Sequence, residues 1–195
     1  MALSVFDLFS IGIGPSSSHT VGPMRAARIF LASLGENLNK VAKINCVLYG
    51  SLGSTGKGHG TDFAVILGLM GEEPETTDPR CTMPFVAEVN LNHRLKLFNK
   101  HEIEFHPSSD IEFAGMIELP AHPNGMRLQA FDAAGELLKE SYYYSVGGGF
   151  VVSGCAESTD FLDTCDDDEK LFRIRIVTQQ IYLQSAKKPG FQLRK

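Results

Sequence analysis

Side chains able to do chemistry are concentrated in two short glycine-rich segments. The first, GIGPSSSHTVGP at 12–23, stands directly before a run with helical spacing and carries several hydroxyls and one imidazole: Ser16, Ser17, Ser18, His19 and Thr20. Backbone N–H groups in the first turn of a helix favour bound anions, and hydroxyls add hydrogen bonds. The alternative is plain helix capping, which needs only one Ser or Thr. The surplus of hydroxyls favours a site for a carboxylate or phosphate.

The second segment, SLGSTGKGHGTD at 51–62, follows an apolar run and in its second half presents Lys57, His59, Thr61 and Asp62. A nucleotide-binding phosphate loop requires Gly and Ser or Thr where this chain has Ser51 and Gly58, so that interpretation fails. The glycines predict a flexible loop. Two interpretations stay open, a ligand-binding loop and a mobile surface loop that ends in a helix cap.

Two further motifs lie later in the chain. The sequence His122-Pro123-Asn124-Gly125 contains a strong turn signal, and the run at 142–150 reads as a tyrosine-rich strand followed by a glycine bend. His19, His59 and His122 each stand at the end of an expected element. If they converge, three imidazoles with hydroxyls, Lys57 and Asn124 suit acid–base chemistry on a small polar anion.

Hydrophobic periodicity predicts the elements that position these residues. Helical spacing predicts a helix from Pro23 with Gly35 as its C-cap, another at 63–70, and a weaker one from Pro84 to about Phe98. Alternation predicts strands at 42–50, 101–106, 115–120, 126–132 and 137–146, with Asn124-Gly125 as a two-residue hairpin turn. We therefore expect an α/β or α+β domain with a mixed or antiparallel sheet over residues 1–155.

Composition sets the limits of this domain. The 195 residues carry a net charge of −5, which argues against nucleic-acid or membrane partners recognised by bulk charge. The charge is unevenly distributed. Residues 157–169 contain seven acidic side chains and no basic one, and residues 170–195 contain seven basic side chains and no acidic one. We expect residues 156–195 to be a separate tail, irregular or disordered.

The cysteines and the first residues of the chain indicate the cellular compartment. Cys46, Cys81, Cys155 and Cys165 are scattered without a C-x-x-C pair, which suggests neither a zinc site nor a disulfide framework. No apolar stretch is long enough for a membrane span, and the first residues lack the basic region of a signal peptide. The sequence predicts a reduced, cytoplasmic protein.

Four motifs carry a resemblance to a known family. GIGPSSSHTVGP at 12–23, YGSLGSTGKGHGTD at 49–62, HPNGM at 122–126 and YYSVGGGF at 143–150 resemble the N-terminal β domain of bacterial iron–sulfur L-serine dehydratases (L-serine ammonia-lyases). The resemblance implies a fold similar to the allosteric substrate-binding domain of some phosphoglycerate dehydrogenases. It also implies conversion of L-serine to pyruvate and ammonia without pyridoxal phosphate, in an assembly expected to be a homo-oligomer. The [4Fe-4S] cluster of the family is bound by cysteines of a separate, larger catalytic domain.

The resemblance also implies roles for individual residues. His59 would be the general base that removes the α-proton of serine. Seven other residues would bind or orient the substrate: Ser17, Ser18, His19, Thr20, Lys57, His122 and Asn124. The four cysteines match no cluster ligand, so no metal ligand is expected in this chain.

The resemblance ends near residue 153, before any cluster-binding domain. This predicts either a truncated or frameshifted reading frame, or a two-chain enzyme whose catalytic α chain is encoded separately. On either interpretation the chain would be inactive alone. The alternative from another class is a non-catalytic module for small-molecule binding, regulation or dimerisation, which needs anion contacts but no base. A third alternative is a misfolded fragment with its partner-facing surface exposed.

Overall fold

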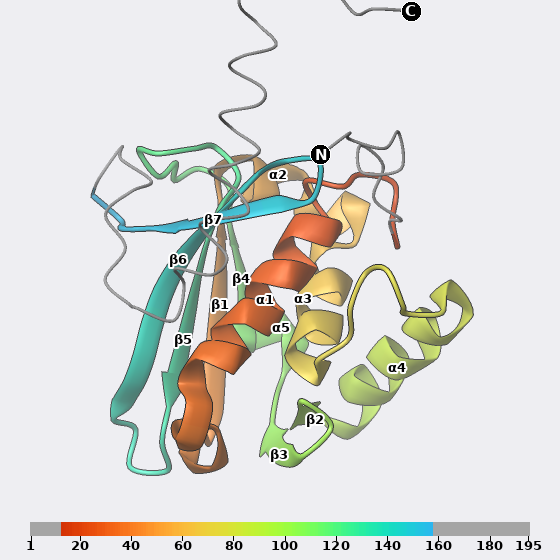
Figure 1. Ribbon diagram of the computed structural model, residues 1–195, viewed down its shortest axis with the longest axis vertical. Helices are drawn as coiled ribbons and strands as arrows, with labels where there is room; N and C mark the ends of the chain where they lie inside the picture. Colours follow the sequence, from red (N-terminus) through yellow and green to blue (C-terminus); the bar gives the residue numbers. More distant parts are fainter. Residues whose placement is uncertain (1–12, 158–195) are drawn as a thin grey trace, which may run out of the picture. The chain divides into compact units, whose positions relative to one another are not determined.

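A mixed sheet of five strands forms the centre of the fold (Figure 1). The structure is a computed structural model and describes residues 13–157. The strands are β1 (Lys43–Tyr49), β4 (Ile111–Ala114), β5 (Gly125–Phe131), β6 (Leu137–Gly147) and β7 (Phe150–Gly154). Their order is β4-β1-β5-β6-β7, with β1 parallel to β4 and the other neighbours antiparallel. The predicted α/β class with a mixed sheet is confirmed.

Helices cover the sheet in an order that Figure 1 makes plain. The larger ones are α1 (Val21–Leu34), α2 (Gly50–His59), α3 (Thr61–Met70) and α4 (Pro79–Asn92). α1 lies in front of the sheet, α3 packs beside α1, and α4 lies outside α3. The smaller elements are η2 (Gly35–Lys40), α5 (Pro107–Asp110) and the two-stranded sheet of β2 (Arg94–Leu97) and β3 (His101–Glu104).

No helix within residues 13–157 is long and apolar enough to cross a membrane.

The core lies where α1 and α3 meet the sheet. The predicted stripe of α1 is buried throughout, at Met24, Ala27, Leu31 and Leu34. The larger of these side chains, Met24, Leu31 and Leu34, each contribute about 1.5–3 kcal/mol on full burial, which explains why this segment folds as predicted. α3 approaches α1 closely at Gly68, where a Cβ would lie 2.2 Å from the carbonyl oxygen of Met24.

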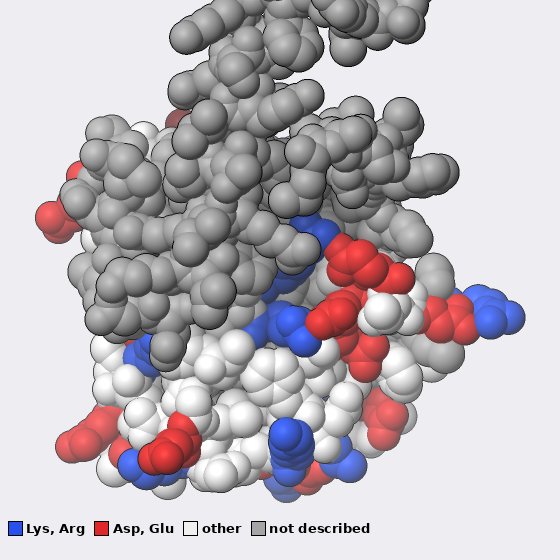
Figure 2. Space-filling model, in the orientation of Figure 1, with Lys and Arg blue, Asp and Glu red and all other residues white. Residues whose placement is uncertain are grey.

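Surface charges are mixed on the face shown in Figure 2. There Lys and Arg lie next to Asp and Glu, and no large region of one sign is visible among the described residues. Arg28 pairs with Glu73, and Arg25 pairs with Glu75, so two arginines of α1 bind the segment that follows α3. These pairs stabilise the docking of α1 against that segment.

Three local predictions are wrong. Residues 51–59 are not a flexible loop, because they form most of α2. Residues 115–120 are not a strand, since β4 ends at Ala114. Asn124-Gly125 therefore does not connect paired strands, and the hairpin turns instead between β5 and β6, where the carboxylate of Asp132 accepts the N–H groups of Ala134 and Glu136.

The ends of two other elements, α4 and β3, differ from the predicted ends by a few residues. α4 begins before Pro84, because the Asp78 side chain caps the helix by accepting the N–H of Arg80. It ends at His93, whose φ of 53° is left-handed, so residues 94–97 form a strand and not the last turn of a helix. The strand expected at 101–106 is β3 and ends at Glu104. The tail predicted for residues 156–195 falls almost wholly outside the described residues.

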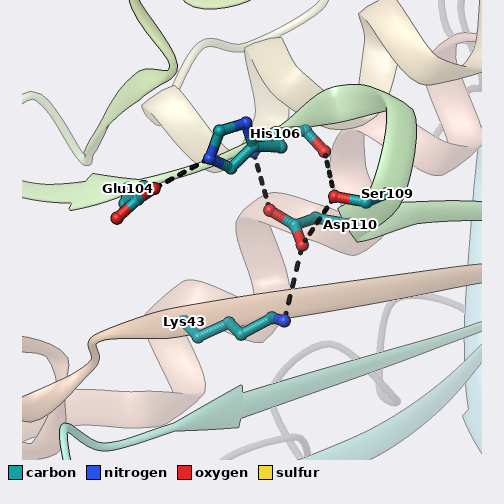
Figure 3. Close-up of polar contacts among 5 residues, drawn as sticks. All are labelled: Lys43, Glu104, His106, Ser109 and Asp110. Atoms are coloured by element: carbon teal, nitrogen blue, oxygen red, sulfur yellow. Dashed lines mark hydrogen bonds and ion pairs between the residues drawn. The ribbon is translucent and has the colours of Figure 1, made fainter.

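A group of polar residues connects the segment before β4 to β1 (Figure 3). The Asp110 carboxylate accepts the backbone N–H of His106 and lies 3.7 Å from the Lys43 ammonium nitrogen. The His106 imidazole lies 2.8 Å from a Glu104 oxygen and stacks on the ring of His93 at 4.4 Å. This group holds structural elements together.

Candidate active site

The imidazole of His19 is the centre of a polar cluster. His19 itself is buried, with 8% of the residue exposed, whereas the hydroxyl-bearing residues around it are half-buried or exposed. Nδ1 lies 3.0 Å from the Ser18 hydroxyl and 3.4 Å from that of Ser16. Nε2 lies 3.0 Å from the Thr55 hydroxyl and 3.2 Å from that of Ser51. The first glycine-rich segment and α2 are thus joined through one histidine.

α2 presents its polar side chains to His19 because of their spacing. Ser51, Thr55 and His59 are each four residues apart, so they lie along one face of a helix. Four of the ten residues of α2 are glycines, and each costs about 1 kcal/mol of helix propensity relative to alanine. Close packing compensates, because a Cβ at Gly53 would lie 2.5 Å from both the Leu48 oxygen and the Gly115 nitrogen. The glycines allow α2 to lie directly on β1 and the segment after β4.

His59 stands at the last turn of α2, beside His19. The centroids of the two rings are 4.8 Å apart. Nδ1 of His59 lies 2.9 Å from the carbonyl oxygen of Thr55 and must donate, because a carbonyl only accepts. Neutral His59 therefore carries its proton on Nδ1 and keeps a lone pair on Nε2. That lone pair can accept a proton.

A cavity of about 280 Å³ opens next to His59. Lys57 and Thr20 also contribute to its lining, and apolar side chains form much of the remainder, among them Phe63, Leu67 and Met83. The cavity therefore combines a cationic group and an imidazole with an apolar wall. Such a composition suits a small molecule that carries one anionic group.

The predicted residues His122 and Asn124 lie at the opposite end of α2. The carbonyl oxygen of Pro123 accepts the N–H of Ser51, 2.8 Å away. His122 Nδ1 accepts the N–H of Asn124 at 3.0 Å, so neutral His122 carries its proton on Nε2. The Asn124 amide nitrogen donates to the Ser145 carbonyl at 3.1 Å. Pro123 thus joins the segment that carries His122 and Asn124 to the first turn of α2, whereas His59 stands in the last turn, eight residues beyond Ser51.

Comparison with known proteins identifies the family. Residues 4–156 match the family described as "Serine dehydratase beta chain". The chain belongs to this family. It is 46% identical to L-serine dehydratase of Streptomyces coelicolor over 195 residues, which is 99% of this chain and 42% of that protein. L-serine dehydratase 2 of Escherichia coli is 48% identical over 77% of this chain and 33% of its own length.

A third relative, the L-serine dehydratase of Mycobacterium tuberculosis, is 43% identical over 78% of this chain and 33% of its own length. The chain thus spans less than half the length of these three relatives. The predicted resemblance to the serine dehydratase β domain is confirmed.

Part of the backbone of the first segment is already hydrogen-bonded. The N–H groups of His19 and Thr20 donate to the carbonyl of Ser16, and that of Gly22 donates to Ser17. Pro23 has no N–H. These three amides are therefore not available to an anion. Thr20 is also committed, because its hydroxyl donates to the Ser16 carbonyl at 2.7 Å.

Three residues of the site were not predicted: Ser51 and Thr55 contact His19, and the Ser145 carbonyl accepts from the Asn124 amide. Thr61, which was singled out with the second segment, is fully buried, and its hydroxyl donates to the His19 carbonyl at 2.7 Å. The four-residue spacing of Ser51, Thr55 and His59 was a usable signal. It was missed because glycine content predicted a loop.

The described residues do not fit an iron–sulfur cluster. No group of three His, Cys, Asp or Glu within residues 13–157 could hold a metal ion. Cys46 is buried in β1, and burial raises the pKa of its thiol, which opposes the thiolate that a metal requires.

Burial controls the charge of two imidazoles. Desolvation lowers the pKa of His19; the hydrogen-bonding backbone of Ser51 partly offsets this, and the neighbouring His59 lowers the pKa further. Burial also lowers the pKa of His122. Both rings are therefore neutral at pH 7.

These lowered pKa values predict a loss of stability in mild acid. As the pH falls towards the ordinary histidine pKa of 6.5, the unfolded chain binds more protons at His19 and His122 than the folded chain does. The free energy of unfolding should therefore fall between pH 7.5 and pH 5.5, measured by urea titration of the full chain. His19→Gln should reduce this pH dependence. An unfolding free energy that stays constant over the range would contradict the prediction.

Proposed function

We propose that this chain is the substrate-binding β domain of an L-serine ammonia-lyase, which converts L-serine to pyruvate and ammonia. Membership of the serine dehydratase beta chain family supports this, and the names of its relatives agree. The structural observation that carries the proposal is the His19–His59 pair beside a cavity that Lys57 also lines. A regulatory module would need the cation but not a free imidazole nitrogen.

His59 is the general base in this proposal. Its Nε2 lone pair takes the α-proton, and the Thr55 carbonyl stabilises the resulting imidazolium through the Nδ1–H bond. His19, neutral and buried beside it, adds no opposing positive charge. Loss of the α-proton and the β-hydroxyl gives aminoacrylate, which hydrolyses to pyruvate and ammonia.

The remaining predicted residues bind the substrate in this proposal. The Lys57 ammonium attracts the serine carboxylate, and Ser17, Ser18 and Thr20 offer hydroxyl oxygens from the first segment. Beside the first turn of α2, His122 offers its Nε2–H and Asn124 offers its amide oxygen to orient polar groups of the substrate.

The cofactor is proposed to belong to another part of the enzyme. We infer that a [4Fe-4S] cluster, and not pyridoxal phosphate, is bound by a separate catalytic domain or chain, since residues 13–157 offer no ligand set. The chain alone is then inactive. Location in the cytoplasm and assembly as a homo-oligomer complete the proposal.

A chimera tests the proposal directly. Residues 4–156 would replace the matching segment of the Streptomyces coelicolor relative, with the iron–sulfur cluster loaded anaerobically and pyruvate measured after addition of L-serine. We expect turnover by the chimera and none by the isolated chain. A folded, cluster-loaded chimera that binds L-serine without forming pyruvate would instead support the regulatory module.

A further inference from the structure

Thr55 contacts both imidazoles of the candidate site. Its hydroxyl lies 3.0 Å from Nε2 of His19 and 2.9 Å from the carbonyl oxygen of Ser51, one turn earlier in α2. Its own carbonyl oxygen lies 2.9 Å from Nδ1 of His59. One residue thus connects the buried histidine to the one that lines the cavity.

The Thr55 hydroxyl determines which nitrogen of His19 carries the proton. A hydroxyl has a single proton, and the Ser51 carbonyl can only accept it. If both contacts are hydrogen bonds, the Thr55 oxygen accepts from His19, and Nε2 must be protonated. Neutral His19 then has its lone pair on Nδ1, where the Ser18 hydroxyl can donate at 3.0 Å.

The other hydroxyls around His19 leave this choice open. Ser51 contacts Nε2 at 3.2 Å, and Ser16 and Ser18 contact Nδ1 and each other. Each of the three hydroxyls can rotate to donate or to accept. Of the four hydroxyls, Thr55 is the one whose proton is committed to a carbonyl.

The Thr55 carbonyl fixes the opposite tautomer at His59. It accepts from Nδ1, so the proton of neutral His59 lies on Nδ1 and Nε2 is free. The neighbouring rings therefore hold different tautomers, His19 with its proton on Nε2 and His59 with its proton on Nδ1.

We propose that Thr55 is a positioning residue that sets these two opposite tautomers and so keeps Nε2 of His59 available as a proton acceptor. The catalytic role of Thr55 rests on the proposed function, whereas the assignment of the two tautomers does not. Thr55 is on the exposed side of α2, so the hydroxyl can be replaced without opening the core.

The test uses the full chain labelled with ¹⁵N-histidine, because imidazole nitrogen chemical shifts distinguish the two tautomers. At pH 7.5 we expect the proton of His19 on Nε2 and that of His59 on Nδ1. In Thr55→Val, which keeps the shape and removes the hydroxyl, His19 should become a mixture of tautomers, and Thr55→Ser should restore the Nε2–H form. His59 should keep its Nδ1 proton in all three proteins.

A matched control is Thr77→Val. The Thr77 hydroxyl also donates to a carbonyl four residues earlier, that of Glu73, but contacts no histidine in the described structure. It should leave both tautomers unchanged. The proposal is overturned if His59 carries its proton on Nε2 in the native chain, or if Thr55→Val leaves His19 wholly in its native tautomer.

Turnover of the chimera gives an independent readout. Thr55→Val and Thr55→Ser should both keep kcat near the native value, because the backbone carbonyl that holds the Nδ1 proton of His59 is retained in each. If no chimera turns over, the proposed function fails while the tautomers still decide the role of Thr55. A large loss of kcat in the valine chimera, with His59 still protonated on Nδ1, would overturn the assignment of the catalytic role to the His59 tautomer.

Discussion

Replacing His59 with alanine is expected to lower kcat of the cluster-loaded chimera by about 10²–10⁴-fold, the usual contribution of a general base. The ring lines the cavity, and its bond to the Thr55 carbonyl leaves Nε2 as the atom able to take a proton. The KM for L-serine should change little, because Lys57 and the hydroxyls of the first segment remain. Anaerobic initial rates of pyruvate formation give both constants.

Two further variants separate loss of the base from loss of structure. His59→Asn retains an N–H donor near the Thr55 carbonyl but has no basic nitrogen, so it should lose as much activity as the alanine variant. His106→Ala removes an imidazole that contacts Glu104 and His93 away from the cavity, and turnover should stay at the native level. Native turnover in His59→Ala would show that another group removes the proton.

Sequence reasoning worked where one local signal dominated. α1 has an apolar stripe at helical spacing, and Gly35 ends it with a φ of 51°. β1 alternates, and its predicted inward residues Ile44, Cys46 and Leu48 are all buried. In these elements the local pattern and the tertiary packing favour the same structure, so the pattern alone was sufficient.

It failed where tertiary contacts outweigh local propensity. α2 would be a poor helix in isolation, because four glycines fall within ten residues. Its stability comes from neighbours that are distant in sequence: Gly53 touches the backbone of Gly115, and Ser51 donates to Pro123. Residues 115–120 were misassigned for the same reason, since the carbonyl of Ile117 accepts the N–H of Gly50 at the start of α2 and does not join a strand.

In the candidate site, some residues could be found from the sequence and others could not. His19, His59 and His122 were singled out as residues at element ends, and the structure brings the rings of His19 and His59 together, while Pro123, next to His122, binds the start of the same helix. The contacts of His19 depend on Thr55 and Ser51, which become its neighbours only when α2 is helical. Their role could not be derived from residues assigned to a loop.

Gly50→Ala is expected to have the largest effect on stability among the glycines that shape the site. Gly50 has a φ of 49°, and an added Cβ would lie 2.4 Å from the carbonyl oxygen of Pro123. Left-handed backbone costs an alanine about 1–2 kcal/mol. Overpacking adds about 1–3 kcal/mol, because the clash is with backbone and not with a flexible side chain. Urea unfolding of the full chain measures the sum.

Gly60→Ala is the matched control that isolates the clash. Gly60 has a left-handed backbone, with φ 75° and ψ 34°, but an added Cβ would meet only a ring carbon of Phe63 at 3.6 Å, an ordinary van der Waals contact. It should therefore cost only the backbone part, about 1–2 kcal/mol. The excess cost at Gly50 then measures how tightly the segment that carries His122 and Asn124 packs against α2. Equal losses at the two positions would show that this segment yields easily, and that His122 is not held in place by the first turn of α2.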